Sequence, residues 1–440
     1  MKRIIMILLI LAVSITLWAA GEPEAVETKG GFDGVLTLGV RGGDMQSSYT
    51  KDGIIIPKSA MSDKVMYWRD VILADFPYEV EIRNYAADST TIKLDADIAG
   101  GDAPDVYWDY LGRVNKYANS KYAMPINLTF EELDDYLPSS LDPVIKDGEL
   151  YALPGTAWAA VMVVNKTLVD SVGLGNILSD GSWTIDEFLM VANAVQGKYG
   201  PEYYGYVLFA AGTGGDYWSS FGWMSSFGAK LYDNGKIVVG SKEGIEALEF
   251  MKFMSDTGIA MPGAAGLDYK PNIYAMQSGN IVACGNSSGS ARKPFKQLDG
   301  SGYIDGVIME WPRAPGVEKV PITVGPDAGM VFASTKHEVE AMELLRHINS
   351  VENQQLQCKV NKRFACRKAV GNIVSDEYTW VTTTGIIERN GTFDSGVGLE
   401  KYAEVRNLYP PMLQAIFSGE LTIQEAVDRF VSEGNKVLDE

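Results

Sequence analysis

The chain has 440 residues, of which 46% are hydrophobic and 22% are charged, so it can bury the cores of two or three domain-sized units. Its 57 acidic residues outnumber its 38 basic residues, and the resulting net charge of −19 would repel the phosphate backbone of DNA or RNA. We therefore expect no nucleic acid among its partners.

The first segment, residues 1–21, has the layout of a secretory signal peptide. Lys2 and Arg3 are basic, residues 4–13 are entirely apolar, and three small residues precede a polar stretch. A single membrane anchor is the alternative, since an apolar segment of about 17 residues nearly reaches the length that spans a bilayer. No cysteine lies near the expected cleavage region, so we expect a free periplasmic or extracellular protein without a lipid anchor.

After a polar tail at residues 22–34, expected strands and helices alternate. The expected strands are short apolar or alternating runs, and the expected helices carry apolar residues at helical spacing. In chain order they are a strand at 35–40, a helix at 62–76, a strand at 78–85, a helix at 90–99 and a strand at 105–108. This alternation predicts parallel strands joined by crossover helices, which is an α/β layer.

The pattern repeats with variation along the rest of the chain. Further strands are expected at 151–154, 161–164, 206–210, 281–284 and 307–310. Further helices are expected at 184–196, 243–257, 338–350, 400–408, 411–417 and 422–438. The last of these helices has a capping-box pattern, with Thr422 followed three residues later by Glu425. Two α/β lobes accommodate this number of elements better than one very large sheet.

Three segments carry more specific motifs. Residues 100–109, GGDAPDVYWD, end a helix and lead into a strand that delivers aromatic and acidic groups to its carboxyl end, where α/β sheets bind ligands. Residues 148–166, GELYALPGTAWAAVMVVNK, contain a strand that ends in an Asn-Lys pair. Residues 181–188, GSWTIDEF, open a helix that Thr184 can cap, with Glu187 three residues later.

Together these motifs resemble the bacterial extracellular solute-binding proteins of the large sugar-binding family that serves ABC importers. Less specific matches follow in family order at residues 275–285, 312–316 and 410–438. The resemblance therefore extends over residues 35–438, close to the family spacing throughout.

The resemblance implies an α/β, two-lobed periplasmic-binding-protein-like fold of type II, with the ligand cleft between the lobes. Lobe 1 is expected at residues 35–156 and 311–361, and lobe 2 at residues 157–310 and 362–440. The implied function is capture of a mono- or oligosaccharide by hinge closure, followed by delivery of the closed, liganded protein to the membrane permease of an ABC transporter. We expect a monomer that is not an enzyme and that uses no cofactor or metal.

Aromatic and polar residues near strand ends are the candidate ligand contacts, because sugar faces stack on rings and sugar hydroxyls pair with carboxylates, amides and guanidinium groups. We expect the following residues at the cleft: Arg41, Asp44, Trp108, Asp109 and Trp158 on one side, and Trp218, Trp223 and Asn286 on the other. Asp109 is expected to accept paired sugar hydroxyls, and Trp158 or Trp218 to stack on the ring. The structural alternative is that Asp109 caps the next turn and Trp158 fills the hinge.

The segment after the expected strand at 281–284 departs from the family and raises a rival function. Many sugar binders have a tryptophan there, whereas this chain has Asn286, Ser287 and Ser288, which puts a stacking ring on that wall in doubt. With its flanking glycines the segment matches the GxSxG pattern, so a secreted hydrolase that uses Ser287 with Asp327 and a downstream histidine is a rival. A further rival keeps the binding fold but takes a polyamine or a peptide.

Several other conspicuous residues are assigned to packing. Three tryptophans belong here: Trp68, Trp183 and Trp380. Cys284 lies in an apolar run and is expected to be a core thiol. Cys358 and Cys366, eight residues apart, either form a disulfide or remain two buried thiols.

Overall fold

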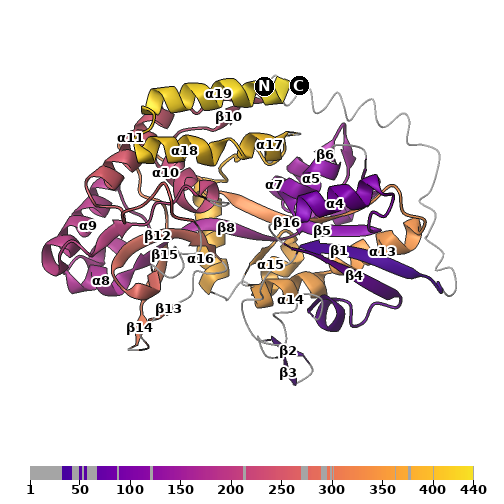
Figure 1. The fold of residues 1–440 in the computed structure, drawn as a ribbon. Coiled ribbons are helices and arrows are strands. Elements are labelled where there is room, and N and C mark those ends of the chain that lie inside the picture. Colours follow the sequence, from indigo (N-terminus) through magenta and orange to yellow (C-terminus); the bar gives the residue numbers. More distant parts are fainter. Residues whose placement is uncertain are drawn as a thin grey trace, which may run out of the picture. The chain divides into compact units, whose positions relative to one another are not determined.

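The computed structural model describes residues 32–41, 49–51, 54–56, 67–86, 89–118, 122–211, 215–268, 276–288, 295–297, 300, 302–361, 363–374, 378–399 and 401–439. The expected signal peptide and most of the expected polar tail lie outside these residues. From Leu36 onward the chain forms one compact unit of strands and helices (Figure 1). None of the helices in the described ranges combines the length and the apolar character needed to cross a membrane.

Nine of the described strands are joined in one sheet. Their order is β4-β1-β5-β16-β8-β12-β9, and β15 and β17 each pair with β8. The bounds are β1 Val35–Arg41, β4 Glu79–Tyr85, β5 Val106–Tyr110, β8 Leu153–Asn165, β9 Tyr204–Tyr206, β12 Ile281–Ser287, β15 Gly306–Met309, β16 Val324–Val331 and β17 Phe364–Ala365. Four small hairpins accompany the sheet: β2 (Tyr49–Lys51) with β3 (Ile54–Ile56), β6 (Ile145–Lys146) with β7 (Glu149–Leu150), β10 (Tyr232–Asp233) with β11 (Lys236–Ile237), and β13 (Phe295–Lys296) with β14 (Tyr303–Ile304).

Strands β1 and β5 confirm the expected parallel layer. They pair in parallel, with Leu38 opposite Val106 and Val40 opposite Trp108. Helix α4 (Thr90–Ala99) lies between β4 and β5 in the chain, as a crossover connection requires. Parallel pairing places the carboxyl ends of β1 and β5 at the same edge of the sheet (Figure 1).

Strand β8 differs from the expectation of two short strands, because it is a single strand of 13 residues, all of them buried. Its first half pairs with β16 and β17, and its second half pairs with β12 and β15. Residues 155–160, between the two expected strands, continue the strand. At Gly155 the ring of Trp108 fills the space where a Cβ would stand. One continuous buried strand therefore runs through both parts of the sheet.

The helices are numerous and several of them are short. Their bounds are η1 Trp68–Ile72, α4 Thr90–Ala99, α5 Leu111–Ala118, α6 Phe130–Asp135, α7 Pro138–Leu141, η2 Asp142–Val144, α8 Lys166–Ser171, η3 Gly175–Leu178, α9 Ile185–Tyr199, η4 Asp216–Ser220, α10 Phe221–Ser226, α11 Lys242–Asp256, α13 Glu338–Ile348, α14 Val351–Asn361, α15 Lys368–Val374, α16 Tyr378–Asn390, α17 Tyr402–Arg406, α18 Tyr409–Ser418 and α19 Ile423–Asp439. Helix α14 was not expected, because it buries mainly polar side chains and therefore lacks an apolar stripe.

Both expected capping boxes are present. At the start of α9, the Thr184 hydroxyl accepts a hydrogen bond from the Glu187 backbone N at 3.2 Å, and the Glu187 carboxylate accepts one from the Thr184 N at 2.7 Å. Thr422 and Glu425 make the same reciprocal pair at the start of α19, at 3.3 and 2.9 Å. These side chains satisfy backbone N–H groups that the first helical turn leaves without partners.

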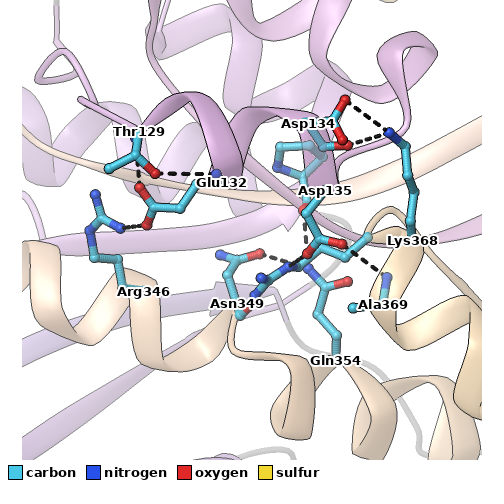
Figure 2. A network of polar contacts seen from close by, with 11 residues as sticks. Thr129, Glu132, Asp134, Asp135, Arg346, Asn349, Gln354, Lys368 and Ala369 are labelled. Carbon is cyan, nitrogen blue, oxygen red and sulfur yellow. Dashed lines mark hydrogen bonds and ion pairs between the residues drawn. The ribbon is translucent and has the colours of Figure 1, made fainter.

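A polar network ties α6 to α13, α14 and α15 (Figure 2). Asp135 accepts a hydrogen bond from Arg367 Nε at 2.6 Å and another from the backbone N of Ala369 at 2.9 Å, so it caps the start of α15. Glu132 forms an ion pair with Arg346 of α13. Arg367 thus contacts Asp135 and the Asn349 carbonyl oxygen, both in residues that the sequence assigned to lobe 1. Strand β17 pairs with Thr156 and Ala157, on either side of the expected boundary between the lobes.

The cysteines are buried thiols in the structure. Cys358 and Cys366 do not form a disulfide, which answers the alternative that the sequence left open. Cys284 lies at the centre of β12, as expected for a core thiol. Burial raises the pKa of the Cys284 and Cys366 thiols to about 12, so both remain protonated and unreactive near neutral pH.

Candidate functional site

A small cavity lies where β1 and β5 end. Its volume is about 50 Å³. It is lined by Arg41, Tyr67, Trp68, Trp108, Asp109, Tyr110, Asp327, Gln357, Asn361 and Arg363. The structure thus brings together three of the predicted site residues, Arg41, Trp108 and Asp109, at the edge of the sheet where parallel strands converge.

The cavity contains an interacting group of charges. Asp109 forms a buried ion pair with Arg113, one turn along α5, with Arg113 Nε 2.5 Å and Nη2 3.0 Å from the two carboxylate oxygens. Asp327 of β16 forms a second ion pair with Arg363. Arg41 lies within electrostatic range of both carboxylates and of both other guanidinium groups.

Protonation of these groups follows from burial and neighbouring charge. Burial alone would raise the pKa of the Asp109 carboxyl, but the charge and hydrogen bonds of Arg113 outweigh burial and hold that pKa below its ordinary value. For Arg41, burial is the largest influence and lowers the pKa, while Asp109 and Asp327 oppose that shift. Asp109 therefore stays ionised throughout the physiological range.

The Asp109 carboxylate is fully occupied by the protein itself. Besides both bonds from Arg113, it accepts a hydrogen bond from the Tyr107 hydroxyl at 2.7 Å and one from the Tyr110 backbone N at 2.6 Å. Its side chain is 1% exposed. These contacts leave the carboxylate little capacity for sugar hydroxyls, and the bond from the Tyr110 N agrees with the structural alternative, in which Asp109 caps the next turn.

An aromatic group stands beside the cavity and is joined to it through Tyr110. The Trp158 ring lies 4.4 Å from that of Trp218, 5.2 Å from that of Tyr217 and 6.4 Å from that of Tyr110. Gly325, the strand partner of Trp158, leaves room for the indole, because a Cβ there would collide with the ring. Two predicted stacking residues, Trp158 and Trp218, are therefore neighbours.

The Tyr110 hydroxyl connects segments that are far apart in the sequence. Its oxygen lies 2.5 Å from the Tyr217 hydroxyl oxygen, and it donates to the Tyr402 hydroxyl at 2.8 Å. Tyr217 is supported by Arg406, whose guanidinium lies 4.3 Å from the ring centre and forms a buried ion pair with Asp216. Burial raises the pKa of the Tyr110 hydroxyl to about 12, so it remains a hydrogen-bond donor.

The remaining predicted residues lie elsewhere. Asp44 is outside the described residues. Trp223 is 0% exposed and packs against the rings of Phe188 and Tyr206 in the core, so the structure does not bring it to the cavity. Asn286 is buried in β12 opposite Val161, and its side-chain oxygen accepts a hydrogen bond from the next backbone N.

The serine pattern does not have the geometry of a nucleophile elbow. Ser287 is the last residue of β12 and pairs with Ala160 of β8, whereas an elbow serine occupies a sharp turn between a strand and a helix. Asp327 is engaged by Arg363, and a ring nitrogen of His347 lies 2.9 Å from the carbonyl oxygen of Ile72. Neither group is arranged as a partner for Ser287.

The sequence interpretation missed several residues that line the cavity. Trp68 was assigned to packing, yet it lines the cavity and packs edge-on against Trp108, with ring centres 5.9 Å apart. It is 2% exposed, and its Nε1 has no hydrogen-bond partner among the residues that the structure describes. Three more lining residues come from α14 and the residues after it, namely Gln357, Asn361 and Arg363. The sequence signal that could have identified them is a run of polar residues at helical spacing in a segment with few apolar residues.

A larger cavity, of about 310 Å³, lies beside α6 and the start of α14 and contains no predicted site residue. It is lined by both Arg346 and Arg367, but these are paired with Glu132 and Asp135 in the network of Figure 2. Its two guanidinium groups are therefore already paired within the protein.

Comparison with known proteins places the chain in a family. Residues 68–381 match the family model described as bacterial extracellular solute-binding protein. A curated relative, the arabinooligosaccharide-binding protein of Halalkalibacterium halodurans, is 26% identical over 229 residues, which is 50% of this chain and 49% of the relative. The match thus spans about half the length of that curated relative.

Solved structures with the same fold cover nearly the whole chain. An ABC transporter solute-binding protein from Thermotoga lettingae bound with α-D-tagatose superposes with a TM-score of 0.72 at 19% identity, covering 92% of this chain and 99% of that one. The maltotriose-binding protein of Thermus thermophilus bound with maltotriose gives 0.70 at 16% identity, covering 92% and 100%. The maltose-bound protein MalE3 of T. maritima gives 0.73 at 18% identity, covering 92% and 99%.

These neighbours confirm the expected α/β, two-lobed solute-binding fold. The family model covers well over half of the chain. This chain therefore belongs to the bacterial extracellular solute-binding protein family.

Proposed function

We propose that the protein captures a saccharide outside the cytoplasm and delivers it to the permease of an ABC importer. The observation that carries this proposal is the pairing of a charged cavity with an adjoining group of aromatic rings, Tyr110, Trp158, Tyr217 and Trp218. Sugars need both kinds of surface, because their C–H faces stack on rings and their hydroxyls pair with polar groups. The names and ligands of the relatives support the same class of cargo.

The size of the cavity indicates how a ligand would enter. Its volume of about 50 Å³ holds a few water molecules, each needing roughly 10–15 Å³, whereas small-molecule pockets measure roughly 300–1,000 Å³. A sugar does not fit this volume, so the protein must open around the cavity before a sugar enters and close over it afterwards. Such opening and closing is hinge closure. The ligand stabilises the closed state to the extent that it binds this state more tightly than the open one.

The charge around the cavity disfavours the polyamine alternative. Both carboxylates among the described residues that line it are already paired, Asp109 with Arg113 and Asp327 with Arg363. A polycation would have to displace an arginine from one of these pairs to gain a carboxylate partner. A sugar, which carries no positive charge, requires no such displacement.

The remaining parts of the proposal concern export and assembly. We propose that residues 1–21 act as a cleavable signal peptide, that no lipid anchor follows, and that the protein works as a monomer. The closed, liganded form is the species that the permease recognises. The protein makes and breaks no bond, which agrees with the placement of Ser287 inside β12.

A thermal-shift screen over sugars, amino acids, peptides and polyamines tests this proposal. A saccharide at a hundredfold excess over its dissociation constant should add about 2.7 kcal/mol to the apparent free energy of unfolding. Trp158→Ala should abolish most of that shift, whereas Trp380→Phe, a ring packed against the Cys358 core cluster, should keep it. A shift with a polyamine or peptide and with no saccharide would contradict the proposal.

A further inference from the structure

Two buried polar atoms in the cavity wall lack a hydrogen-bond partner in the part of the chain that the structure describes. One is the Nε1 of Trp68, and the other is the hydroxyl of Tyr67; each residue is 2% exposed. The Asn361 side chain lies close to the Tyr67 hydroxyl without making a hydrogen bond of ordinary geometry. Proteins pair nearly all of their buried polar groups, because an unsatisfied one is costly. Two such atoms on neighbouring residues of one wall therefore indicate that a polar group fills this cavity.

The lining offers donors and acceptors together. An indole N–H can only donate, whereas a tyrosine hydroxyl can donate and accept. Gln357 uses its amide nitrogen on the Ile348 carbonyl oxygen at 3.1 Å, which leaves its own carbonyl oxygen to accept. An alcohol also donates and accepts, so it can pair with all of these groups. A carboxylate, which only accepts, or an ammonium group, which only donates, cannot.

The charges of the lining also favour an uncharged group. The described lining residues include two guanidinium groups, of Arg41 and Arg363, and two carboxylates, of Asp109 and Asp327, so their formal charges cancel. An ion that entered would therefore be desolvated without a net opposite charge to offset that cost. A neutral hydroxyl avoids most of this cost.

The size of the cavity limits which part of a sugar can occupy it. About 50 Å³ is too small for a whole sugar, but it can hold a hydroxymethyl group, which consists of a carbon and a hydroxyl oxygen. The rings of Trp68 and Trp108, with centres 5.9 Å apart, provide an apolar wall for the carbon. The two unpaired polar atoms provide partners for the oxygen.

We propose that this cavity is a subsite for the exocyclic hydroxymethyl group of one sugar residue, and that Trp68 Nε1 and the Tyr67 hydroxyl bind its oxygen in the closed protein. The sugar ring itself then lies between the cavity and the aromatic group around Trp158. This inference rests on the proposed saccharide function and narrows its substrate class. Hexopyranoses and pentofuranoses carry the hydroxymethyl group, pentopyranoses lack it, and 6-deoxyhexoses lack its oxygen.

Calorimetric titration of the wild type with sugars that differ only in this group tests the inference. Three pairs share a ring configuration and differ by the whole group: glucose with xylose, galactose with L-arabinose, and mannose with lyxose. Cellobiose with xylobiose extends the comparison to disaccharides, and the 6-deoxy forms of the three hexoses lack the oxygen alone. At least one hexose or its disaccharide should bind about tenfold or more tightly than its pentose counterpart, and removal of the oxygen should abolish most of that advantage.

Variants then connect the preference to the two residues. Trp68→Phe should weaken binding of the preferred sugar about threefold to tenfold and leave binding of its 6-deoxy form unchanged, because that form has no oxygen for the indole to contact. Tyr67→Phe should show the same selective loss, and it provides the test should Trp68→Phe not fold. Trp183→Phe is the control, since it removes an indole N–H that is bonded to the Glu310 carbonyl oxygen in the core, and it should keep the full preference.

The outcomes separate this inference from the function on which it rests. Sugars without the hydroxymethyl group that bind as tightly as those with it would overturn the subsite and leave saccharide capture standing. Equal losses for the preferred sugar and its 6-deoxy form, in folded Trp68→Phe and Tyr67→Phe, would overturn the roles of both residues. Absence of binding by every saccharide would overturn the inference and the proposed function together.

Discussion

Trp68 lies in the cavity wall and carries a buried donor that finds no partner in the described part of the chain. Leaving a buried N–H unsatisfied costs about 1–3 kcal/mol, and Trp68→Phe relieves that cost while losing some ring contact. We expect the free energy of unfolding to change by less than about 1 kcal/mol, and affinity for the saccharide to fall about threefold to tenfold. Chemical denaturation and calorimetry measure the two effects separately.

Trp183 offers a matched control for this substitution. Its Nε1 donates a hydrogen bond to the Glu310 carbonyl oxygen at 2.9 Å inside the core. Trp183→Phe should therefore lower stability by about 1–3 kcal/mol and leave affinity unchanged. Equal losses of stability in both variants, with no change in affinity, would show that Trp68 only packs.

The Asp109–Arg113 pair makes stability depend on pH in a defined direction. A carboxyl whose pKa is lowered in the folded state stabilises the fold above its unfolded pKa, and that contribution disappears as the pH falls through the folded value. The pKa of Asp109 is held below its ordinary value of 3.8, so the loss occurs below about pH 4. Asp109→Asn should cost about 3 kcal/mol near pH 7, because it leaves a guanidinium without its carboxylate.

Urea denaturation of both proteins near pH 7 and near pH 3 measures this effect. The difference between the wild type and Asp109→Asn should shrink at the lower pH, where the carboxyl of the unfolded wild type is protonated and folding must release that proton. A difference that stays constant would mean that the charge of Asp109 contributes nothing to stability.

At the level of elements, Asp135 joins α6 to α15 through two hydrogen bonds (Figure 2). Asp135→Ala removes the cap from α15 and leaves Arg367 without its carboxylate, so we expect a loss of about 2 kcal/mol in the free energy of unfolding. Asp134→Ala is the control, because its ion pair with Lys368 is largely exposed and should contribute less than about 1 kcal/mol. Similar losses from both substitutions, measured by urea denaturation, would contradict the capping role.

Secondary-structure elements with local sequence signals were predicted, and elements that depend on tertiary contacts were missed. The strands β1 and β5 and the capped helices α9 and α19 carry local signals, namely apolar runs and Thr-x-x-Glu boxes, and these were confirmed. The continuity of β8 and the polar helix α14 depend on tertiary partners, such as the Trp108 ring over Gly155. Local pattern contains no information about such partners.

The residues of the candidate site also divide into those that the sequence could place together and those that only the fold brings together. Arg41, Trp108 and Asp109 could be placed together because parallel strands end at a common edge. Asp327 and Arg363 are 36 residues apart, on β16 and after α14, and only the fold brings them into one ion pair. Trp68 lies at the start of a short helix, and the sequence around it does not distinguish a tryptophan that lines a cavity from one that only packs.

At the level of the whole molecule, the Tyr110 hydroxyl joins Tyr217 and Tyr402, which come from distant parts of the chain. Tyr110→Phe removes both hydrogen bonds while keeping the ring beside Trp158, so it should weaken the closed state and lower saccharide affinity by about threefold to tenfold. Tyr117→Phe is the control, since its hydroxyl donates to Asp95 at 3.0 Å and so joins residues of the same part of the chain. Small-angle scattering should show a smaller radius of gyration when saccharide is added to the wild type, and a weaker response in Tyr110→Phe. An equal response in all three proteins would contradict the role of Tyr110 in closure.

We expect a saccharide to bind between the charged cavity and the aromatic group, and a calorimetric titration of the wild type and of Trp158→Ala with one screened saccharide measures this binding. One sugar should bind per chain, with an affinity at least about tenfold weaker in the folded Trp158→Ala variant. A dissociation constant that is the same in both proteins, or the absence of binding by any saccharide, would contradict it.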